Sequence, residues 1–187
     1  MTDHPRFPAE WEPQSAILMA WPHAGTDWAP RLQSVQSCFA GLCSAISRYQ
    51  PLLLLVPDER IEANARAALT AANGHMHSVR FIRLPYNDTW LRDSGPITLR
   101  DNGGFRLLDF HFTAWGGKFE AGLDDQLVAG MVALGLFAEA RHQRIDFALE
   151  GGGIETDGAG TLLSTWHCLH ERHPDASRLA IEAQLKT

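Results

Sequence analysis

Hydrophobic and polar positions alternate in blocks along the first 84 residues, and these blocks predict strands and helices in turn. Short apolar runs bounded by proline or polar residues are typical of buried strands, and we expect strands at 16–21, 52–56 and 79–84. Apolar residues recur at helical spacing over 32–49, and an alanine-rich amphipathic stretch over 61–72 ends near Asn73-Gly74. Both stretches predict helices with one buried face.

The pattern changes after residue 84 to pairs of short strands. Residues 97–99 and 105–112 flank Asp101-Asn102-Gly103-Gly104, and residues 154–156 and 161–165 flank a similar Asp-led glycine turn, so we expect two hairpins. Helices are expected over 123–137 and 177–185. An acidic residue, Asp93 or Glu150, precedes each hairpin. We interpret the chain as one α/β domain over residues 1–187, built from repeated strand–helix modules.

Composition and charge exclude several classes of protein. The 187 residues are 45% hydrophobic and 20% charged, which is enough for a substantial core. The net charge of −6 argues against nucleic acid or an anionic membrane as a partner. No apolar run approaches the ~20 residues of a membrane span, and no basic-then-apolar signal segment is visible. Three cysteines without a CxxC pair fit a reducing compartment, so we expect a cytoplasmic protein.

The densest group of candidate functional residues lies at 87–96, directly after a predicted strand. Within NDTWLRDSGP, Asp88 and Asp93 supply carboxylates and Trp90 supplies an aromatic face. Such a set suits a flat cation such as guanidinium, which offers donors in one plane to a carboxylate and stacks on an indole. The alternative is a structural loop in which Arg92 pairs with Asp88 or Asp93.

Two glycine-rich segments are weaker candidates. Glu150 precedes Gly151 in LEGGG and occupies the position in the second module that Asp93 occupies in the first. Trp115 lies in AWGGK, where glycines permit close backbone approach. Taken alone, LEGGG also fits a turn that enters a strand, and Trp115 also fits a packed loop residue.

The segment Trp166-His167-Cys168-Leu169-His170 places a thiol beside two imidazoles. On an extended chain His167 and Cys168 would point to opposite faces, which argues against a Cys–His nucleophile. No second pair at metal-ligand spacing appears, and neither glycine-rich nucleotide-binding fingerprint is present. We therefore expect neither a metal nor a cofactor.

Several of these motifs, in order, resemble the agmatine deiminase and bacterial-type peptidyl-arginine deiminase family. The segments are FPAEWEPQSAILMAWP, NDTWLRDSGP, FTAWGGKF, LEGGGIETDGAGTLLSTWHCL and IEAQL. The resemblance implies the five-bladed α/β propeller called the pentein fold, of which this chain would form about the N-terminal half. It also implies hydrolysis of a guanidine C–N bond, with agmatine giving N-carbamoylputrescine and ammonia on the route to putrescine.

The resemblance assigns roles to individual residues. Asp93 and Glu150 match the catalytic carboxylates that bind the guanidinium, and we place Trp90, Asp88, Trp115 and Gly151 among the substrate-binding positions. The family's Gly-His-x-Asp segment and nucleophilic cysteine have no counterpart here, and Cys168 is not at the nucleophile's position.

We therefore expect a chain that is inactive alone and that associates with itself or with the C-terminal half of such an enzyme. A peptidyl-arginine substrate, or a non-catalytic guanidinium-binding role, remains the alternative.

Overall fold

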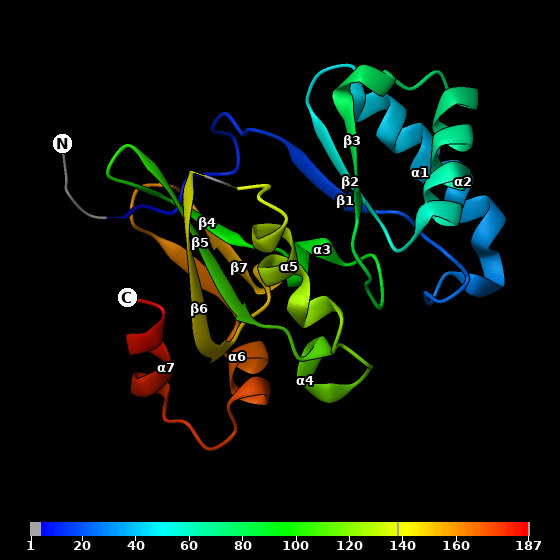
Figure 1. Cartoon of the computed structure of the whole chain (residues 1–187). Helices are drawn as coiled ribbons and strands as arrows, with labels where there is room; N and C mark the ends of the chain where they lie inside the picture. The colour runs from blue at the N-terminus through cyan, green and yellow to red at the C-terminus, as the bar shows by residue number, and fades with distance from the viewer. Residues whose placement is uncertain (1–4, 138, 187) are drawn as a thin grey trace. The chain divides into compact units, whose positions relative to one another are not determined.

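The computed structural model describes residues 5–137 and 139–186, which divide into two compact units (Figure 1). One unit comprises Pro13–Leu91, and the other comprises Met1–Glu12 together with Arg92–Thr187. The short helix α3 (Leu91–Ser94) begins at the boundary between them. Each unit has its own sheet and its own hydrophobic core.

The unit at 13–91 is a three-stranded parallel sheet with two helices. Its elements are β1 (Ile17–Ala20), η1 (Ala29–Arg31), α1 (Leu32–Ser47), β2 (Leu52–Val56), α2 (Glu59–Ala71), η2 (Met76–Ser78) and β3 (Val79–Arg83). The strand order is β1-β2-β3, and both neighbouring pairs are parallel. The three strands and two helices expected from the apolar pattern are confirmed, with boundaries displaced by at most about two residues.

The core of this unit explains why those elements form. Leu52, Leu54 and Val56 alternate along β2 and join one buried cluster with Cys43 of α1 and Leu69 of α2. In Figure 1 both helices lie together beside the sheet. The apolar stripes of the helices are thereby buried against a strand that has no polar residue.

The predicted ends of α2 are also made by specific contacts. Asp58 caps the helix by accepting a hydrogen bond from the backbone nitrogen of Ile61 at 2.8 Å. At the other end Asn73 has a φ of +57°, and the backbone nitrogen of Gly74 donates to the carbonyl of Leu69. This is the Schellman ending that the Asn73-Gly74 pair predicted.

The second unit contains a three-stranded sheet, a two-stranded sheet and several short helical segments. Its strands are β4 (Ile97–Asp101), β5 (Gly104–His111), β6 (Ala140–Ala148), β7 (Ile154–Thr156) and β8 (Leu162–Ser164). Its helical segments are α4 (Ala114–Gly117), η3 (Asp124–Gln126), α5 (Leu127–Ala133), η4 (Gly151–Gly153), α6 (Trp166–Arg172) and α7 (Arg178–Gln184).

Both predicted hairpins are confirmed. Strand β4 pairs antiparallel with β5, and β7 pairs antiparallel with β8. Asn102 and Gly103 at the first turn have φ values of +46° and +83°, as a two-residue turn with Asn-Gly requires. The fold is thus mixed α/β with small sheets, and within the described residues none of the sheets closes on itself.

Strand β6 is an element that the hydrophobic pattern did not predict. It pairs in parallel with β5 and lies at the edge of the sheet, and most of its residues are exposed. Charged contacts hold it there, because the buried carboxylate of Asp109 on β5 accepts from Arg144 at 2.6 Å and contacts His142 at 2.8 Å. Asp125 also accepts two hydrogen bonds from Arg144. These ion pairs add to the strand ladder and to the buried Phe147, and a hydrophobicity pattern does not register them.

Two other expectations require correction. The helix expected over 123–137 is shorter, since η3 and α5 together end at Ala133. Gly135, with a φ of +70°, terminates α5 through a Schellman motif in which Leu136 donates to the Met131 carbonyl. The segment around Cys168 is helix α6 rather than extended chain, and Thr165 caps it.

Helix α7 was expected over 177–185 and is confirmed, with Ser177 as its cap. Within the described part of the chain, no helix has the length and apolar character needed to cross a membrane.

We predict that alkylating reagents distinguish the two cysteines of α1. Cys43 is fully buried, and that burial raises the pKa of its thiol to about 12, whereas Cys38 is exposed. Iodoacetamide should modify Cys38 in the native protein and reach Cys43 only after unfolding, as read by tandem mass spectrometry. Equal labelling of both thiols in the native protein would contradict the packing of α1 on β2.

Candidate functional site

The structure distributes the predicted site residues between the two units. Asp93, Trp115, Glu150 and Gly151 belong to the unit that contains residues 92–187. Asp88 and Trp90 belong to the unit at 13–91.

Asp93 is the point at which three separate segments of the second unit meet. Its Oδ2 accepts a hydrogen bond from the indole nitrogen of Trp115 at 3.1 Å, and its Oδ1 accepts one from the backbone nitrogen of Gly152 at 2.9 Å. Both donors are neutral, so they orient the carboxylate without cancelling its charge. The segments RDSGP, AWGGK and LEGGG, far apart in the sequence, are thus brought together within this unit.

The glycines after Glu150 allow this close approach. A side chain at Gly151 would overlap the backbone carbonyl oxygen of Arg92, and one at Gly152 would overlap the Asp93 carboxylate. Around Gly153, by contrast, nothing lies within 4 Å of the place a side chain would take. Gly151 was predicted to bind substrate, and the structure shows it buried against the backbone that carries Asp93.

Trp115 reaches Asp93 from a backbone in an unusual conformation. Ala114 and Trp115 have φ values of +46° and +60°, and Gly116 and Gly117 continue the left-handed turn at +88° and +80°. A non-glycine residue in this region costs of order 1–3 kcal/mol. The Trp115 indole also packs edge-on against Phe112 and Phe119, with ring centroids 5.5 and 5.8 Å apart. These contacts stabilise a turn that aims the indole nitrogen at the carboxylate.

Glu150 is buried and forms an ion pair inside the same unit. Its Oε1 accepts a hydrogen bond from Nε of Arg172 at 2.7 Å, and the side chains of the two residues are 7% and 5% exposed. Burial lowers the pKa of Arg172, but its hydrogen bond to Glu150 and the charges of Glu150 and Glu171 outweigh burial, so the pKa is raised. Arg172 is therefore a permanent cation beside the buried carboxylate.

Further ion pairs close the contacts into a ring. A terminal nitrogen of Arg172 lies 3.0 Å from Glu171, and Lys118, directly after α4, lies 3.0 Å from the other oxygen of Glu171. Hydrogen bonds join Trp115 and Gly152 to Asp93, and ion pairs join Glu150, Arg172, Glu171 and Lys118. The backbone completes the ring twice, from Gly152 to Glu150 and from Lys118 to Trp115. We call these residues the carboxylate ring.

The charges of the ring favour a cationic ligand. Lys118, Glu171, Arg172 and Glu150 alternate in sign and cancel one another, and Asp93 adds one negative charge that no cation in the ring balances. The ring includes no thiol, so it holds carboxylates suited to binding a guanidinium and no nucleophile to attack one.

Asp88 and Trp90 take part in a second cluster within the unit at 13–91. Oδ1 of Asp88 accepts from the backbone nitrogen of Thr89 at 2.7 Å, and the hydroxyl of Thr89 accepts from the indole of Trp28 at 2.8 Å. The rings of Trp28 and Trp90 lie 5.7 Å apart, and Trp90 is 43% exposed. This cluster offers an accessible aromatic surface next to a carboxylate.

Sequence reasoning missed Arg172, Lys118 and Trp28. The signal for Arg172 was weak, because a Glu-Arg pair in a polar helix usually indicates an exposed face. Trp28 follows a Thr-Asp pair in a turn-rich segment and had the same residue types as the NDTW motif. Pairing of Arg92 with Asp88 or Asp93 was the alternative interpretation of this loop, and Arg92 instead forms ion pairs with Glu10 and Glu155.

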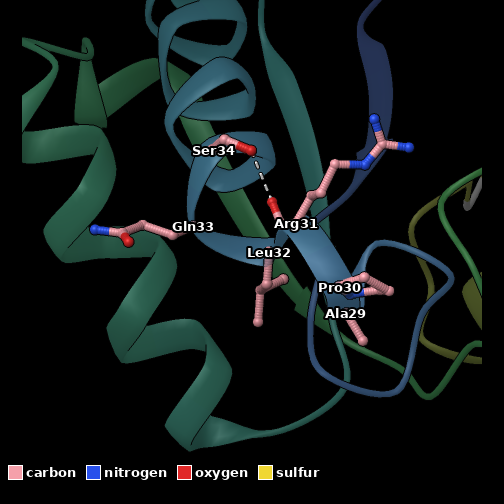
Figure 2. A pocket seen from close by; sticks show the side chains of 6 residues that line it. All are labelled: Ala29, Pro30, Arg31, Leu32, Gln33 and Ser34. Atoms are coloured by element: carbon pink, nitrogen blue, oxygen red, sulfur yellow. Dashed lines mark hydrogen bonds between the residues drawn. The ribbon is translucent and has the colours of Figure 1, made fainter.

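A shallow hollow also lies at the beginning of α1, as Figure 2 shows. Six consecutive residues, Ala29 to Ser34, line it, and the hydroxyl of Ser34 donates to the carbonyl of Arg31 at 2.9 Å. None of the predicted site residues lines this hollow. The hollow is open and is lined by one short segment of the chain, so we do not consider it as the functional site.

Comparison with known proteins adds independent information. Residues 6–187 match the family model described as Porphyromonas-type peptidyl-arginine deiminase. The chain is 38% identical over 190 residues to agmatine deiminase from Pseudomonas aeruginosa (strain UCBPP-PA14), covering 97% of this chain and 49% of that relative.

Solved structures agree with the sequence comparison. The structure of C. jejuni agmatine deiminase with substrate bound is 30% identical, with a TM-score of 0.86, covering 98% of this chain and 53% of that one. Agmatine deiminase of Enterococcus faecalis is 30% identical, with a TM-score of 0.81, covering 97% and 49%. The chain therefore spans about half the length of the relatives it matches.

We predict that alanine substitutions at the three consecutive glycines have graded effects. Gly151→Ala should lower the free energy of unfolding by about 1–3 kcal/mol, because the backbone of Arg92 must move. Gly152→Ala should cost less, because the Asp93 side chain can rotate away, and Gly153→Ala should change stability by no more than about 0.5 kcal/mol. Urea unfolding followed by tryptophan fluorescence measures all three. Equal stability of the three variants would contradict the close approach.

Proposed function

The chain belongs to the Porphyromonas-type peptidyl-arginine deiminase family, and from this membership we propose that it carries the guanidinium-binding part of an agmatine deiminase. The reaction proposed for the whole enzyme is agmatine plus water giving N-carbamoylputrescine plus ammonia, a step toward putrescine. The observation that carries this proposal is the carboxylate ring, in which Asp93 and Glu150 are held by one connected set of contacts.

The chemistry of a guanidinium fits these two carboxylates. The cation is planar and presents its N–H donors in one plane, so carboxylates at its edge bind it by paired, charge-assisted hydrogen bonds. We assign Asp93 and Glu150 this role. We assign Asp88 and the exposed ring of Trp90 to the substrate-binding surface, Trp115 to orienting Asp93, and Gly151 to admitting the loop that carries Glu150.

The remaining chemistry needs groups that this chain does not provide. In the proposed reaction a thiolate adds to the central guanidine carbon, and the C–N bond breaks as ammonia leaves with a proton from an acid. Water then displaces the thiolate and yields the carbamoyl product. The segments that would supply the cysteine and the His-x-Asp acid–base pair are absent from the 187 residues, so we propose that the chain alone binds but does not turn over substrate.

Agmatine is the preferred substrate because the curated relatives named above are agmatine deiminases. The family model is described by peptidyl-arginine, which makes a protein arginine side chain the second candidate. Both substrates present the same guanidinium to Asp93 and Glu150, and they differ at the far end of the molecule. The alternative to both deiminase functions is that the chain binds a guanidinium without a catalytic role.

We predict that the purified chain binds agmatine and forms no N-carbamoylputrescine. Calorimetry should detect binding, and Asp93→Asn should weaken it by at least about tenfold, since a hydrogen-bonded charge pair is lost. Asp146→Asn is the matched control, because it removes the same charge from an exposed side chain of the same unit. Mass spectrometry of the reaction mixture measures the product.

Two results would overturn parts of this proposal. Absence of agmatine binding would refute the guanidinium site. Product formation by protein of 20.7 kDa intact mass, free of longer deiminase, would refute the inactivity of the chain.

We also propose that the chain represents about half of a five-bladed propeller and associates through surfaces that other blades cover in a whole enzyme. Large apolar side chains are exposed on its helices and strands, with Leu163 of β8 65% exposed and Leu179 of α7 79% exposed. Such side chains favour association with a second copy or with a C-terminal half.

Light scattering coupled to gel filtration should therefore give a mass above 20.7 kDa at micromolar concentration. Leu163→Glu should shift the population toward the monomer, because it places a charge in the apolar contact. A monomer over the whole concentration range would contradict the proposal.

A further inference from the structure

Arg172 is a buried cation whose only assigned task so far is to pair with Glu150. It is the last residue of α6, and the residue after it fastens the helix end to β6. The ring of His173 stacks on Phe147 at 3.9 Å between centroids, and its Nε2 lies 2.9 Å from the carbonyl oxygen of Ala148. The contacts of His173 thus hold the end of α6, and the hydrogen bond from Nε to Glu150 holds the Arg172 guanidinium.

The contact between Arg172 and Glu150 leaves part of the carboxylate available. The guanidinium uses Nε to reach Oε1 of Glu150. Within the described residues, no other side chain bonds the Glu150 carboxylate. Oε2 therefore retains its capacity to accept hydrogen bonds. A terminal nitrogen of Arg172 lies 3.0 Å from Glu171 without the geometry of a hydrogen bond, and Lys118 pairs with the other oxygen of Glu171.

A buried carboxylate requires such a partner. Removing a carboxylate from water costs several kcal/mol unless a cation and hydrogen bonds compensate. Arg172 supplies the cation and a hydrogen bond to one oxygen of Glu150, Oε1. Its guanidinium remains charged at every physiological pH. Glu150 is then buried with one oxygen paired and the other left to accept a hydrogen bond.

We propose that Arg172 is a positioning residue for guanidinium binding, which holds Glu150 in the orientation in which Oε2 accepts a donor from the ligand. This inference rests on the proposed function, because it assumes that Glu150 binds the guanidinium. Arg172 itself does not touch the ligand. Glu171 pairs with both Arg172 and Lys118. These pairs leave the negative charge of Asp93 in the ring uncompensated.

The opposite arrangement would make Arg172 an internal competitor that occupies the ligand's place. The charges argue against it. The two cations of the ring are balanced by Glu150 and Glu171, and Asp93 leaves one negative charge uncompensated, which matches one guanidinium. The two arrangements predict opposite effects of removing Arg172: weaker binding if it positions Glu150, and tighter binding if it competes.

Agmatine titration of the full 187-residue chain tests the proposal. Arg172→Gln should weaken agmatine binding by at least about tenfold, because Glu150 loses its charged partner. Arg172→Lys, which restores a positive charge in the same place, should recover binding to within about threefold of the wild-type chain. Arg178→Gln is the matched control, since Arg178 forms an exposed pair with Glu182 on α7 in the same unit. Circular dichroism and the melting temperature of each variant are recorded beside the affinity.

Each outcome separates the possibilities. Wild-type affinity in Arg172→Gln, or tighter binding, overturns the positioning role. Equal losses of affinity in Arg172→Gln and Arg172→Lys that follow equal losses in melting temperature also overturn it, because they indicate a purely structural residue. If Arg172→Gln does not fold, full recovery of affinity in Arg172→Lys still supports the role of the charge. No binding by the wild-type chain overturns the proposed function itself, and the inference with it.

Discussion

The carboxylate of Asp93 is the constraint on which the rest of the site depends. One of its oxygens is held by the indole of Trp115 and the other by the backbone of Gly152, so a single side chain fixes two loops that are distant in the sequence. The close approach of these loops requires glycine at positions 151 and 152, and the left-handed turn at 114–117 places the Trp115 indole at the carboxylate. Because both donors are neutral, the structural contacts of Asp93 do not consume the charge that a cationic ligand needs.

Buried ion pairs also join parts of the second unit, in addition to its apolar core. Asp109 with Arg144 attaches the mostly polar β6 to β5, and Glu150 with Arg172 attaches helix α6 to the loop before β7. A buried pair of this kind adds little net stability compared with apolar packing, but removing one partner is expensive. Such pairs therefore specify which segments meet more than they stabilise the fold.

The elements that hydrophobic spacing and turn chemistry control were predictable from the sequence. Strand β2, the helix ending at Asn73-Gly74 and the Asn102-Gly103 turn follow from local rules alone. The strand β6 was not predictable in this way, because its partner Asp109 lies more than 30 residues away and its surface is polar. The helix expected to reach residue 137 ended early because the apolar spacing continues past Gly135, whose conformation terminates it.

In the candidate site too, some residues were predictable from the sequence and others were not. Asp93 and Glu150 were singled out by residue type and by their equivalent places before two hairpins, and in the structure Gly152, in the loop after Glu150, donates to Asp93. Arg172 escaped notice because its burial is a tertiary property: nothing in HERHP distinguishes a buried arginine from an exposed one. Sequence motifs thus identify the carboxylates that would bind a ligand, but they do not identify the buried residues that hold those carboxylates in place.

The left-handed turn at Ala114 and Trp115 has a consequence for directed evolution of this chain. Two non-glycine residues hold an unfavourable backbone conformation so that one indole reaches a carboxylate. Glycine at position 114 would relieve its share of that cost without removing the indole, so a library screened for heat resistance alone would accumulate Ala114→Gly. The turn therefore trades robustness for the orientation of Asp93, and a useful screen must reward ligand affinity at the same time as thermal tolerance.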